Sequence, residues 1–530
     1  MLDILCICGI FFSMEPFMTS EELHLARQIG SLNYLNPFTS ERLDCEREIL
    51  GKDAVGGLFV WHNANGGKSS NPNVAKIRER CVWLSARLRE RLQRGRAEIS
   101  REAFQAYDEF SIYCLYDQYF PQLTDSLKQG MTTTRVPFFP DFQTDFQNRL
   151  QGMPGPFESQ FSCGKTFAVF HQICRAFHAV FGDIAGGSEE AARLRAKIWQ
   201  SIFTHDIARY HRLLFDRMNQ ITTLITGESG TGKELVARAI AMSQYIPFDE
   251  ARGEFVQDNQ SSFKALQLSA MPQSIIESEL FGHIRGAYTG AVADHAGYLE
   301  ICTPSDSIFL DEIGETSLEM QIKLLRVLQS RSFQRLGDIA PRSFQGKLLA
   351  ATNRNLVAEC QKGTFRSDLF YRLCADAIET VPLRCMLNGG DEELYRFVKV
   401  LSLRILQDDS EAAHFADEAC DWIRKNLGLK YPWPGNVREL EQCLRNLLIR
   451  GSYTPSSAIR SGKAGEESLG EYFRDCRLTA EEVMRQYLQA LYEREGNLAR
   501  TAAAAGLDRR TVRKYLDKLP ADASSISHHP

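Results

Sequence analysis

The sequence predicts an α/β domain in the middle of the chain, with a mainly α or mixed region before it and an all-α region after it. Its 530 residues exceed what one hydrophobic core usually holds, so about three domains are expected. Between residues 183 and 450, apolar stretches of strand length alternate with helical patterns, as in a sheet covered by helices. Within this part, residues 221–242 read as a strand, a glycine-rich loop and a helix. These observations define the fold class.

Changes in composition divide the chain into five segments. The first is rich in aromatic residues, the third in Ser, Gly, Pro and charge, and the fourth has a helical pattern. The expected boundaries are 1–182 for a regulatory or sensor region of unknown type, 183–450 for the α/β domain, 451–470 for a linker, 471–519 for a helical module and 520–530 for a polar tail.

Bulk composition limits the partners and the compartment. Lys and Arg total 62 against 67 for Asp and Glu, so the chain as a whole is no polyanion binder and any nucleic-acid contact needs a local patch. The 14 cysteines are scattered without zinc-site spacing, which favours reduced thiols in a cytoplasmic protein. Residues 4–12 are apolar but too short to span a bilayer, so we expect a buried first strand there and no membrane contact.

The first region carries no recognisable sensor signature. Six aromatic residues from Phe104 to Tyr119 recur at steps of three, a stripe that packs in a core more often than it lines a ligand site. Four prolines in residues 136–157 predict an irregular segment. The position of this region ahead of the other two suggests that it receives a small-molecule or protein signal, an analogy of architecture only.

The glycine-rich loop has the composition of a phosphate-binding loop. Its glycines allow backbone N–H groups to surround phosphates, and the following helix adds the positive end of its dipole. Lys233 is expected to neutralise the phosphates, whereas Glu234 stands where the general pattern has the Ser or Thr that holds Mg²⁺. The alternative is a chance glycine-rich turn. The predicted nucleotide contacts in this loop are Gly227, Glu228, Ser229, Gly230, Thr231, Gly232, Lys233 and Glu234.

Two further strand ends strengthen the nucleotide hypothesis. The run 307–313 is a buried-strand pattern that ends in Asp311 and Glu312. At that position Asp311 is expected to hold Mg²⁺ through water, and Glu312 to polarise an attacking water. A third buried strand ends in Thr352 and Asn353, polar groups able to sense a γ-phosphate.

Taken together, these residues resemble the AAA+ domain of bacterial sigma-54-dependent transcription activators over about 222–448. That family's phosphate loop reads GESGTGKE, as it does here with Glu234 included. The run 277–283 reads ESELFGH, and it is followed by a loop that resembles the family's GAFTGA loop, which touches sigma-54. The loop carries Tyr in place of the family's Phe, and its residues are Gly286, Ala287, Tyr288, Thr289, Gly290 and Ala291.

The resemblance also implies roles for three arginines, ATP and Mg²⁺ as cofactors, and assembly into a ring, expected to be a hexamer. The run 365–372 looks like the arginine-finger segment, which makes Arg366 and Arg372 the candidates for acting on a neighbour's γ-phosphate. Arg438 matches the sensor II arginine of the helical lid, and the pair at 352–353 matches sensor I. For any single arginine, a structural salt bridge is the alternative.

One position departs from the family pattern. Counting back from Glu277, Gln267 stands where the family has an asparagine that holds the catalytic glutamate at rest. Glutamine keeps the amide but lengthens the side chain by one methylene. We therefore expect weaker resting control of Glu312.

Near the C-terminus, an Ala-rich helix ends at Gly506 and a second helix follows from Arg509 to Leu516. This is helix-turn-helix spacing, with tight packing expected at Ala502 and Ala503. It resembles the Fis-type domain of the same family, although a plain helical hairpin is the alternative. The second helix supplies a local positive patch, and its candidate contacts to DNA bases or phosphates are Arg509, Arg510, Thr511, Arg513 and Lys514.

The resemblance implies a cytoplasmic activator that binds double-stranded DNA upstream of a promoter and remodels the closed complex of sigma-54 RNA polymerase by ATP hydrolysis. Two alternatives stay open from the residues. One is an AAA+ remodelling ATPase with a different client, and the other is a DNA-binding regulator without sigma-54 activity. The sequence does not reveal the signal, its sign or the target promoters.

Overall fold

The computed structural model describes residues 15–55, 71–94, 97–128, 134–151, 156–257, 263–455 and 480–516. The chain divides into two compact units, Met1–Tyr453 and Thr454–Pro530, and each is considered by itself. The strand expected at 4–12, residues 456–470 of the expected linker and the tail at 520–530 lie outside the described residues.

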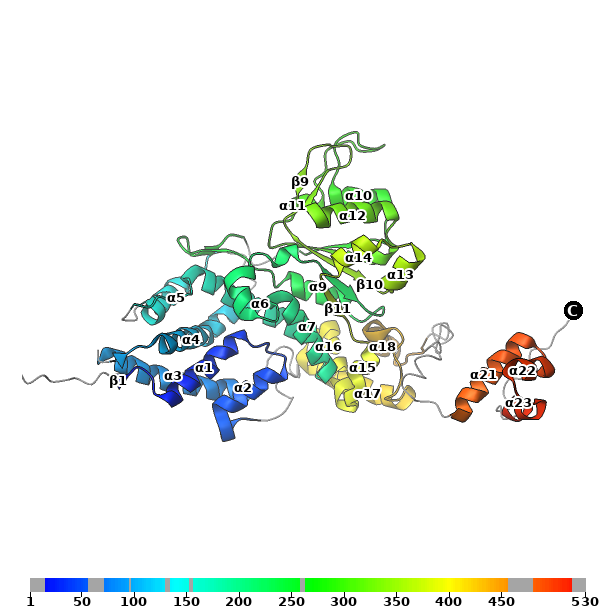
Figure 1. Ribbon diagram of the computed structural model, residues 1–530, viewed down its shortest axis with the longest axis horizontal. Coiled ribbons are helices and arrows are strands. Elements are labelled where there is room, and N and C mark those ends of the chain that lie inside the picture. Colours follow the sequence, from blue (N-terminus) through cyan, green and yellow to red (C-terminus); the bar gives the residue numbers. More distant parts are fainter. Residues whose placement is uncertain are drawn as a thin grey trace, which may run out of the picture. The chain divides into compact units, whose positions relative to one another are not determined.

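The first part of the larger unit is helical, as the sequence predicts (Figure 1). α1 packs along α4, and α3 buries Ile77, Leu84 and Leu88. Two short strands, β1 (Glu15–Pro16) and β2 (Ala97–Glu98), pair in parallel. The helices are α1 (Ser20–Ser31), α2 (Ser40–Leu50), α3 (Pro72–Gln93), α4 (Arg101–Lys128), α5 (Phe139–Phe146), α6 (Cys163–Asp183) and α7 (Glu189–Phe203).

The expectation of an irregular segment at 136–157 is wrong for its first half. Residues 139–146 form α5, which continues into a π-helical turn at Gln147–Gln151. Pro140 lies in the first turn of α5, where no intrahelical donor is needed and the fixed φ of proline suits a helix. Phe139, Phe142 and Phe146 are buried on one side of α5, so core packing outweighs the proline signal.

The middle of the chain contains the predicted α/β core. Its five parallel strands lie in the order β11–β3–β10–β7–β6, so their carboxyl ends meet at one edge. The strands are β3 (Thr223–Thr226), β6 (Phe263–Gln267), β7 (Ser307–Asp311), β10 (Lys347–Thr352) and β11 (Asp376–Glu379).

Alternate strand residues face two different layers of helices, because successive side chains of a strand point to opposite faces. Ile225 and Phe309 belong to the core that α7 and α9 cover, whereas Leu224 and Leu310 belong to the core under α10, α12 and α14. The helices not yet given are α9 (Lys233–Ala241), α10 (Gln273–Phe281), α11 (Tyr298–Ile301), α12 (Leu318–Ser330), α13 (Leu356–Lys362) and α14 (Ser367–Leu373).

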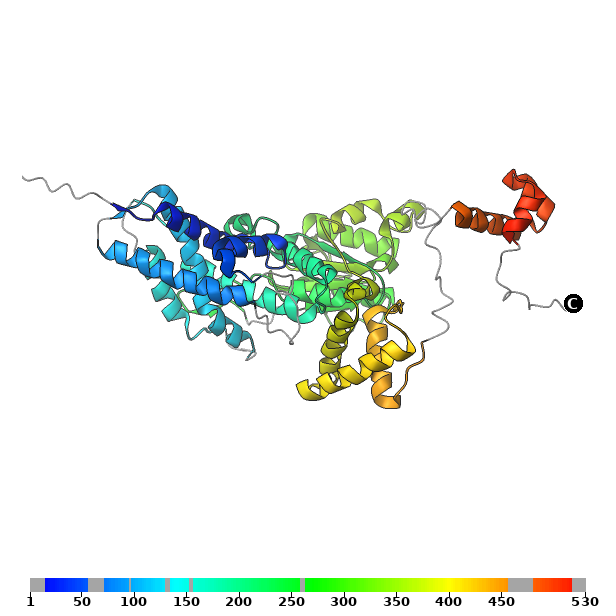
Figure 2. The same ribbon diagram turned by 90° about the horizontal axis from the view of Figure 1, so that it is seen from below.

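A group of helices follows the sheet and forms the predicted lid. α16 (Asp391–Leu406) packs against α17 (Asp409–Asn426) and α18 (Asn436–Arg450), and Figure 2 shows them as a yellow and orange group beside the sheet. The short α15 (Leu383–Met386) connects β11 to this group. Before the sheet, α6 ends at Asp183 and packs against both α4 and α9.

The smaller unit contains three helices among its described residues, α21 (Ala480–Glu495), α22 (Leu498–Ala505) and α23 (Arg509–Leu516). Leu488, Ala502 and Val512 form its core, one residue from each helix. Packing at Ala502 is confirmed, but the expectation for Ala503 is wrong, since its side chain is exposed. In the part of the chain that the structure describes, no helix is long and apolar enough to cross a membrane.

Candidate functional site

A cleft of about 470 Å³ lies at the carboxyl edge of the sheet. The glycine-rich loop connects the end of β3 to the start of α9 and forms one of its walls, with residues from Ser229 to Glu234 in the lining. Asp311, Glu312 and Asn353 reach the same cleft from the ends of β7 and β10. The structure therefore brings together residues that the sequence places in three separate motifs.

Two glycines of the loop are required by close contacts. Gly227 has φ +143°, and a Cβ atom there would lie 2.0 Å from the hydroxyl of Thr380, the residue after β11. Gly230 has φ +78°, and its Cβ would lie 2.3 Å from the carbonyl oxygen of Gly435. Any side chain at either position would force the loop away from the sheet or from the lid.

Lys233 bends back over the loop that precedes it. Its Nζ donates hydrogen bonds of 3.0 Å each to the carbonyl oxygens of Gly227 and Glu228. Burial lowers the pKa of the Lys233 ammonium, and the nearby Asp311 carboxylate acts in the opposite direction. The cation is thus held at the start of α9, where the helix dipole also favours an anion.

The two carboxylates of β7 differ in their surroundings. Asp311 ends the strand, and its Oδ1 accepts a hydrogen bond of 2.9 Å from the amide of Glu312. Glu312 adopts a left-handed conformation with φ +57°, uncommon for a residue with a side chain. Because the backbone turns here, the side chains of Asp311 and Glu312 leave the chain in different directions, and both residues line the cleft.

The resting partner of Glu312 is a residue that the sequence reasoning missed. The hydroxyl of Ser269 donates to Glu312 Oε2. Gln267 is the last residue of β6, lies in register with Asp311 and lines the cleft. In the sequence, only the position of Ser269 could have indicated this contact, because Ser269 follows Gln267 by two residues and β6, which ends at Gln267, pairs with β7.

Of the two residues at the end of β10, Asn353 is the one that lines the cleft. Thr352 is buried, and its hydroxyl accepts a hydrogen bond of 3.0 Å from the amide of Arg354. This places Thr352 in support of the turn that presents Asn353.

The lid contacts the glycine-rich loop through the first turn of α18. Arg438 Nη1 donates to the hydroxyl of Ser229 at 3.3 Å, and Arg438 lines the cleft. The amide of Val437 donates to the carbonyl of Gly230 at 3.0 Å. The loop and lid are therefore joined directly by both backbone and side chain.

Asn436 is a second residue that sequence reasoning missed. It is fully buried with φ +54°, and its amide nitrogen donates to Glu228 Oε2 at 3.1 Å and to the Ser229 carbonyl at 3.0 Å. Its oxygen accepts from the amide of Leu383 at 2.9 Å. Arg384 pairs with the Glu228 carboxylate, and this pair lowers the pKa of that carboxyl group. Glu228 thus binds the lid, and its carboxylate is not part of the cleft lining.

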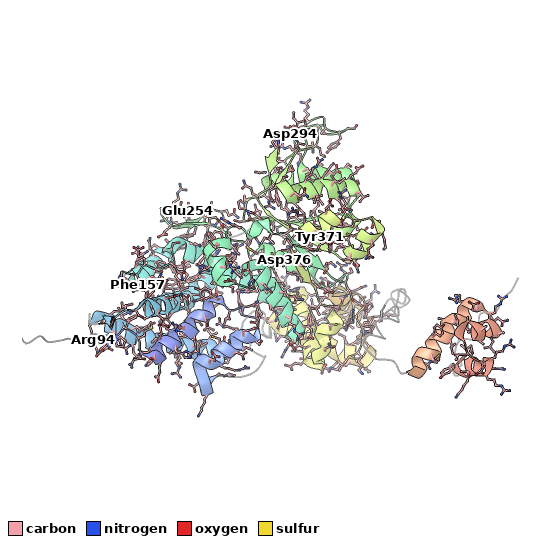
Figure 3. The ribbon with its side chains drawn as sticks, in the orientation of Figure 1. Arg94, Phe157, Glu254, Asp294, Tyr371 and Asp376 are labelled. Carbon is pink, nitrogen blue, oxygen red and sulfur yellow. The ribbon has the colours of Figure 1, made fainter. Side chains whose placement is uncertain are left out.

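The six-residue loop at 286–291 closes a protrusion whose base is fixed to the domain. His283 and His295 exchange backbone hydrogen bonds of 3.0 and 2.9 Å, and Asp294 marks the protruding segment in Figure 3. The amide of Gly286 donates to the carbonyl of Ala291 at 2.9 Å, which closes the loop. Tyr288 is 43% exposed and contacts the ring of His283 edge to face. The loop therefore exposes the Tyr288 ring to solvent on one side while His283 packs against it.

Comparison with known proteins agrees with this geometry. A family model described as the sigma-54 interaction domain matches residues 205–379, which include the cleft strands and the loop at 286–291.

The chain contains a sigma-54 interaction domain. It is 33% identical over 325 residues to the regulatory protein AtoC of Escherichia coli, covering 58% of this chain and 65% of AtoC. It is also 33% identical over 335 residues to the DNA-binding transcriptional regulator NtrC of Rhizobium meliloti, covering 56% of this chain and 65% of that protein. The chain thus spans less than two thirds of either relative.

A solved structure of NtrX from Brucella abortus in complex with ADP also matches, with 23% identity, a TM-score of 0.38, and coverage of 74% of this chain and 84% of that one. The resemblance to sigma-54-dependent activators and the AAA+ fold that it implies are confirmed.

Both candidate arginine fingers of the sigma-54 interaction domain lie at its surface. Arg366 is ion-paired with Asp368 at 2.7 Å, and Arg372 is exposed on α14, next to Tyr371 (Figure 3). Among the described residues neither lines the cleft of its own chain. Arg438, in contrast, lines the cleft of its own chain.

In the smaller unit, the basic residues predicted to contact DNA lie on α23. Arg509, Arg510, Arg513 and Lys514 are exposed, whereas the Thr511 hydroxyl donates to Asp508 at 2.5 Å. Asp508 also accepts from the amides of Arg510 and Thr511. Asp508 therefore caps the start of α23, the helix that carries these cations.

Proposed function

We propose that this protein is a sigma-54-dependent transcription activator that hydrolyses ATP to remodel the closed complex of RNA polymerase at a promoter. The observation that carries the proposal is the combination of a phosphate-loop cleft and a closed surface loop within one sigma-54 interaction domain. The homology to AtoC and NtrC, a regulatory protein and a transcriptional regulator by name, supports it.

The residues of the cleft fit the chemistry of phosphoryl transfer to water. Backbone amides at the start of α9 and the Lys233 ammonium bind phosphate oxygens, while Glu312 accepts a proton from the attacking water. Asp311 and Glu312 line the cleft with Glu234, so carboxylate donors suited to Mg²⁺ are present, and Asp311 is the residue that would hold the ion through water. When bound, Mg²⁺ supplies positive charge against the phosphates.

Assembly into a ring, hexameric in the proposal, explains the surface position of two arginines. Arg366 and Arg372 lie away from the cleft of their own chain, and in a ring they would complete a neighbour's cleft by stabilising negative charge on the transferring phosphoryl group. The lid arginine Arg438 acts within its own chain, since it already contacts the loop through Ser229.

The loop at 286–291 is the proposed contact to sigma-54, with Tyr288 and Thr289 exposed at its tip. Two glycines with positive φ, Gly286 and Gly290, let the short loop reverse direction while its base stays fixed. The exposed cations of α23 are proposed to contact upstream double-stranded DNA, by phosphate contacts and by base edges in the major groove.

A loop variant tests this proposal because it separates hydrolysis from its use. Thr289→Ala leaves the cleft intact, so ATP turnover should stay within about twofold while open-complex formation at a sigma-54 promoter falls by at least roughly tenfold. Thr144→Ala, at an exposed threonine of α5, is the matched control and should change neither. Loss of both activities in Thr289→Ala would contradict the coupling role, and unchanged promoter opening would favour a different client.

A further inference from the structure

A second large cavity lies between the N-terminal helices and the helices next to the sheet. Its volume is about 390 Å³, within the range of small-molecule sites. α4 contributes Tyr113, Tyr116 and Phe120, while α6 and α7 contribute the opposite wall, which includes Phe170, Ile173, Phe177, Trp199 and Phe203. The cavity is therefore mostly aromatic and aliphatic.

Two residues that line this cavity each have a nitrogen atom without a hydrogen-bond partner within the described residues. These atoms are Nε1 of Trp199 and Nε2 of His211, both of them buried. Trp199 is only 4% exposed, so water does not readily reach its N–H group. A buried polar group without a partner costs about 1–3 kcal/mol and is rare in native proteins. A ligand oxygen in the cavity would give the indole N–H an acceptor.

The charged groups at the edge of the cavity are already paired with protein groups. Arg42 donates to Glu46 at 2.9 Å and to the carbonyl of Leu32 at 3.0 Å. Arg78 forms a two-point pair with Asp117 at 2.6 and 2.7 Å. An ionic ligand would have to break these pairs, so the wall favours a neutral one.

The wall of the cavity is also the support of the phosphate-loop helix. α6 packs along α9. In the turn that follows α9, the Ser243 carbonyl accepts from Gln172 at 2.8 Å and the Gln244 carbonyl accepts from Arg175 at 3.1 Å. Ile173, between Gln172 and Arg175, lines the cavity. On α7, two residues after Trp199, Ser201 donates to Asp376 of β11. The helices that line the cavity therefore also contact α9, the turn after it and β11.

We propose that this cavity binds a small neutral aromatic molecule carrying a hydroxyl or carbonyl oxygen, and that its occupancy tightens nucleotide binding through α6 and α7. The oxygen accepts from the Trp199 N–H and meets His211, and the ring fills the aromatic space. The proposed binding of the aromatic molecule does not depend on the proposed function, whereas the proposed effect on nucleotide binding rests on it.

Two probes of similar shape test the binding site on the full chain. 2-Naphthol carries the oxygen, and 2-methylnaphthalene replaces it by a methyl group. By calorimetric titration, 2-naphthol should bind roughly 3- to 10-fold more tightly, as expected for one or two hydrogen bonds in a buried site. Equal affinities, or no binding of either probe, would overturn the proposal.

Aromatic variants show whether the oxygen meets the proposed nitrogen. Trp199→Phe keeps a ring but removes the N–H, so the preference for 2-naphthol should fall to within about twofold. Trp83→Phe, at an exposed tryptophan of α3 outside the cavity lining, should keep it. If Trp199→Phe does not fold, Ile173→Trp, which fills the cavity, should abolish binding of both probes. A preference that survives in a folded Trp199→Phe chain, or unchanged binding in Ile173→Trp, would contradict the site.

The coupling is measured as the ADP dissociation constant with and without saturating 2-naphthol. We expect it to fall at least about threefold in the wild type and to stay constant in Ile173→Trp. An unchanged constant alongside normal 2-naphthol binding would overturn the coupling alone. If ADP does not bind at all while 2-naphthol does, the proposed function fails and the cavity site stands.

Discussion

The cleft at the sheet edge and the cavity among the N-terminal helices have similar volumes but opposite walls. Backbone amides, Lys233 and two carboxylates line the cleft, whereas mostly aromatic side chains line the cavity, and two nitrogens of its lining residues have no hydrogen-bond partner in the described part of the chain. The cleft is built by loops at the ends of adjacent parallel strands, and the cavity by helices far apart in the sequence. A site of the first kind suits phosphate chemistry, and one of the second kind suits recognition of an apolar ligand.

The largest effect should come from breaking the cleft alone. Lys233→Ala removes the cation that faces the phosphates, so ATP turnover should fall at least ~100-fold in a steady-state assay. Lys425→Ala, at an exposed lysine of α17, should change turnover by less than about twofold. Binding of 2-naphthol should be unaffected by either substitution, and its loss in Lys233→Ala would show that the two sites are not separate.

These two sites also differ in how far the sequence could predict them. A strand, a glycine-rich loop and a helix in that order identify the cleft, and parallel strands then bring Asp311 and Asn353 to it. Ser269 and Asn436 were missed because each acts through a contact between segments distant in the chain. The aromatic series of α4 was expected to be core, and Phe104, Phe110, Tyr113 and Tyr119 are indeed buried. Tyr116 is only partly buried, and both it and Tyr113 also line the cavity. No local sequence pattern distinguishes the aromatic residues that line the cavity from those that do not.

The contact between loop and lid gives the next largest effect. Asn436→Ala removes three hydrogen bonds and leaves the Leu383 amide and the Ser229 carbonyl without this partner. We expect the ADP dissociation constant to rise roughly 10-fold or more, as for a loss of about 1–3 kcal/mol. Asn446→Ala, at a partly exposed position of the same helix outside the cleft lining, is the control. Equal constants for the two variants would show that the lid contact does not shape the cleft.

A pH dependence distinguishes the cavity from the cleft. Burial lowers the pKa of the His211 imidazolium to about 4, with the positive charge of Lys165 adding to the effect. An unfolded histidine has a pKa near 6.5, so it binds a proton more readily than the buried His211 does. The free energy of unfolding is therefore highest above pH 6.5 and decreases as the pH falls towards 4.

Urea unfolding of the full chain at several pH values measures this effect. Between pH 7 and 5, the free energy of unfolding should decrease in both proteins, and the decrease should be about 1–2 kcal/mol smaller in His211→Phe than in the wild type. His178→Phe, at an exposed position of α6, should behave as the wild type does. Identical pH slopes in all three proteins would contradict the assignment of His211 as a buried neutral group.

The smallest effect concerns the resting contact of Glu312. Ser269→Ala removes the hydroxyl that donates to this carboxylate, so basal ATP turnover without polymerase should rise about 2- to 5-fold. Gln267→Asn restores the family residue, and it should lower basal turnover if Gln267 weakens resting control. A basal rate that neither substitution changes would show that neither side chain restrains Glu312.

Promoter opening driven by nucleotide hydrolysis is the central claim, and one measurement tests it most directly. The full chain is added to sigma-54 RNA polymerase at a promoter with its upstream DNA site, and strand opening is followed with ATP, with a non-hydrolysable ATP analogue and without nucleotide. Opening with ATP alone is the predicted result. Opening with the analogue or without nucleotide, or no opening with ATP while turnover continues, would contradict it.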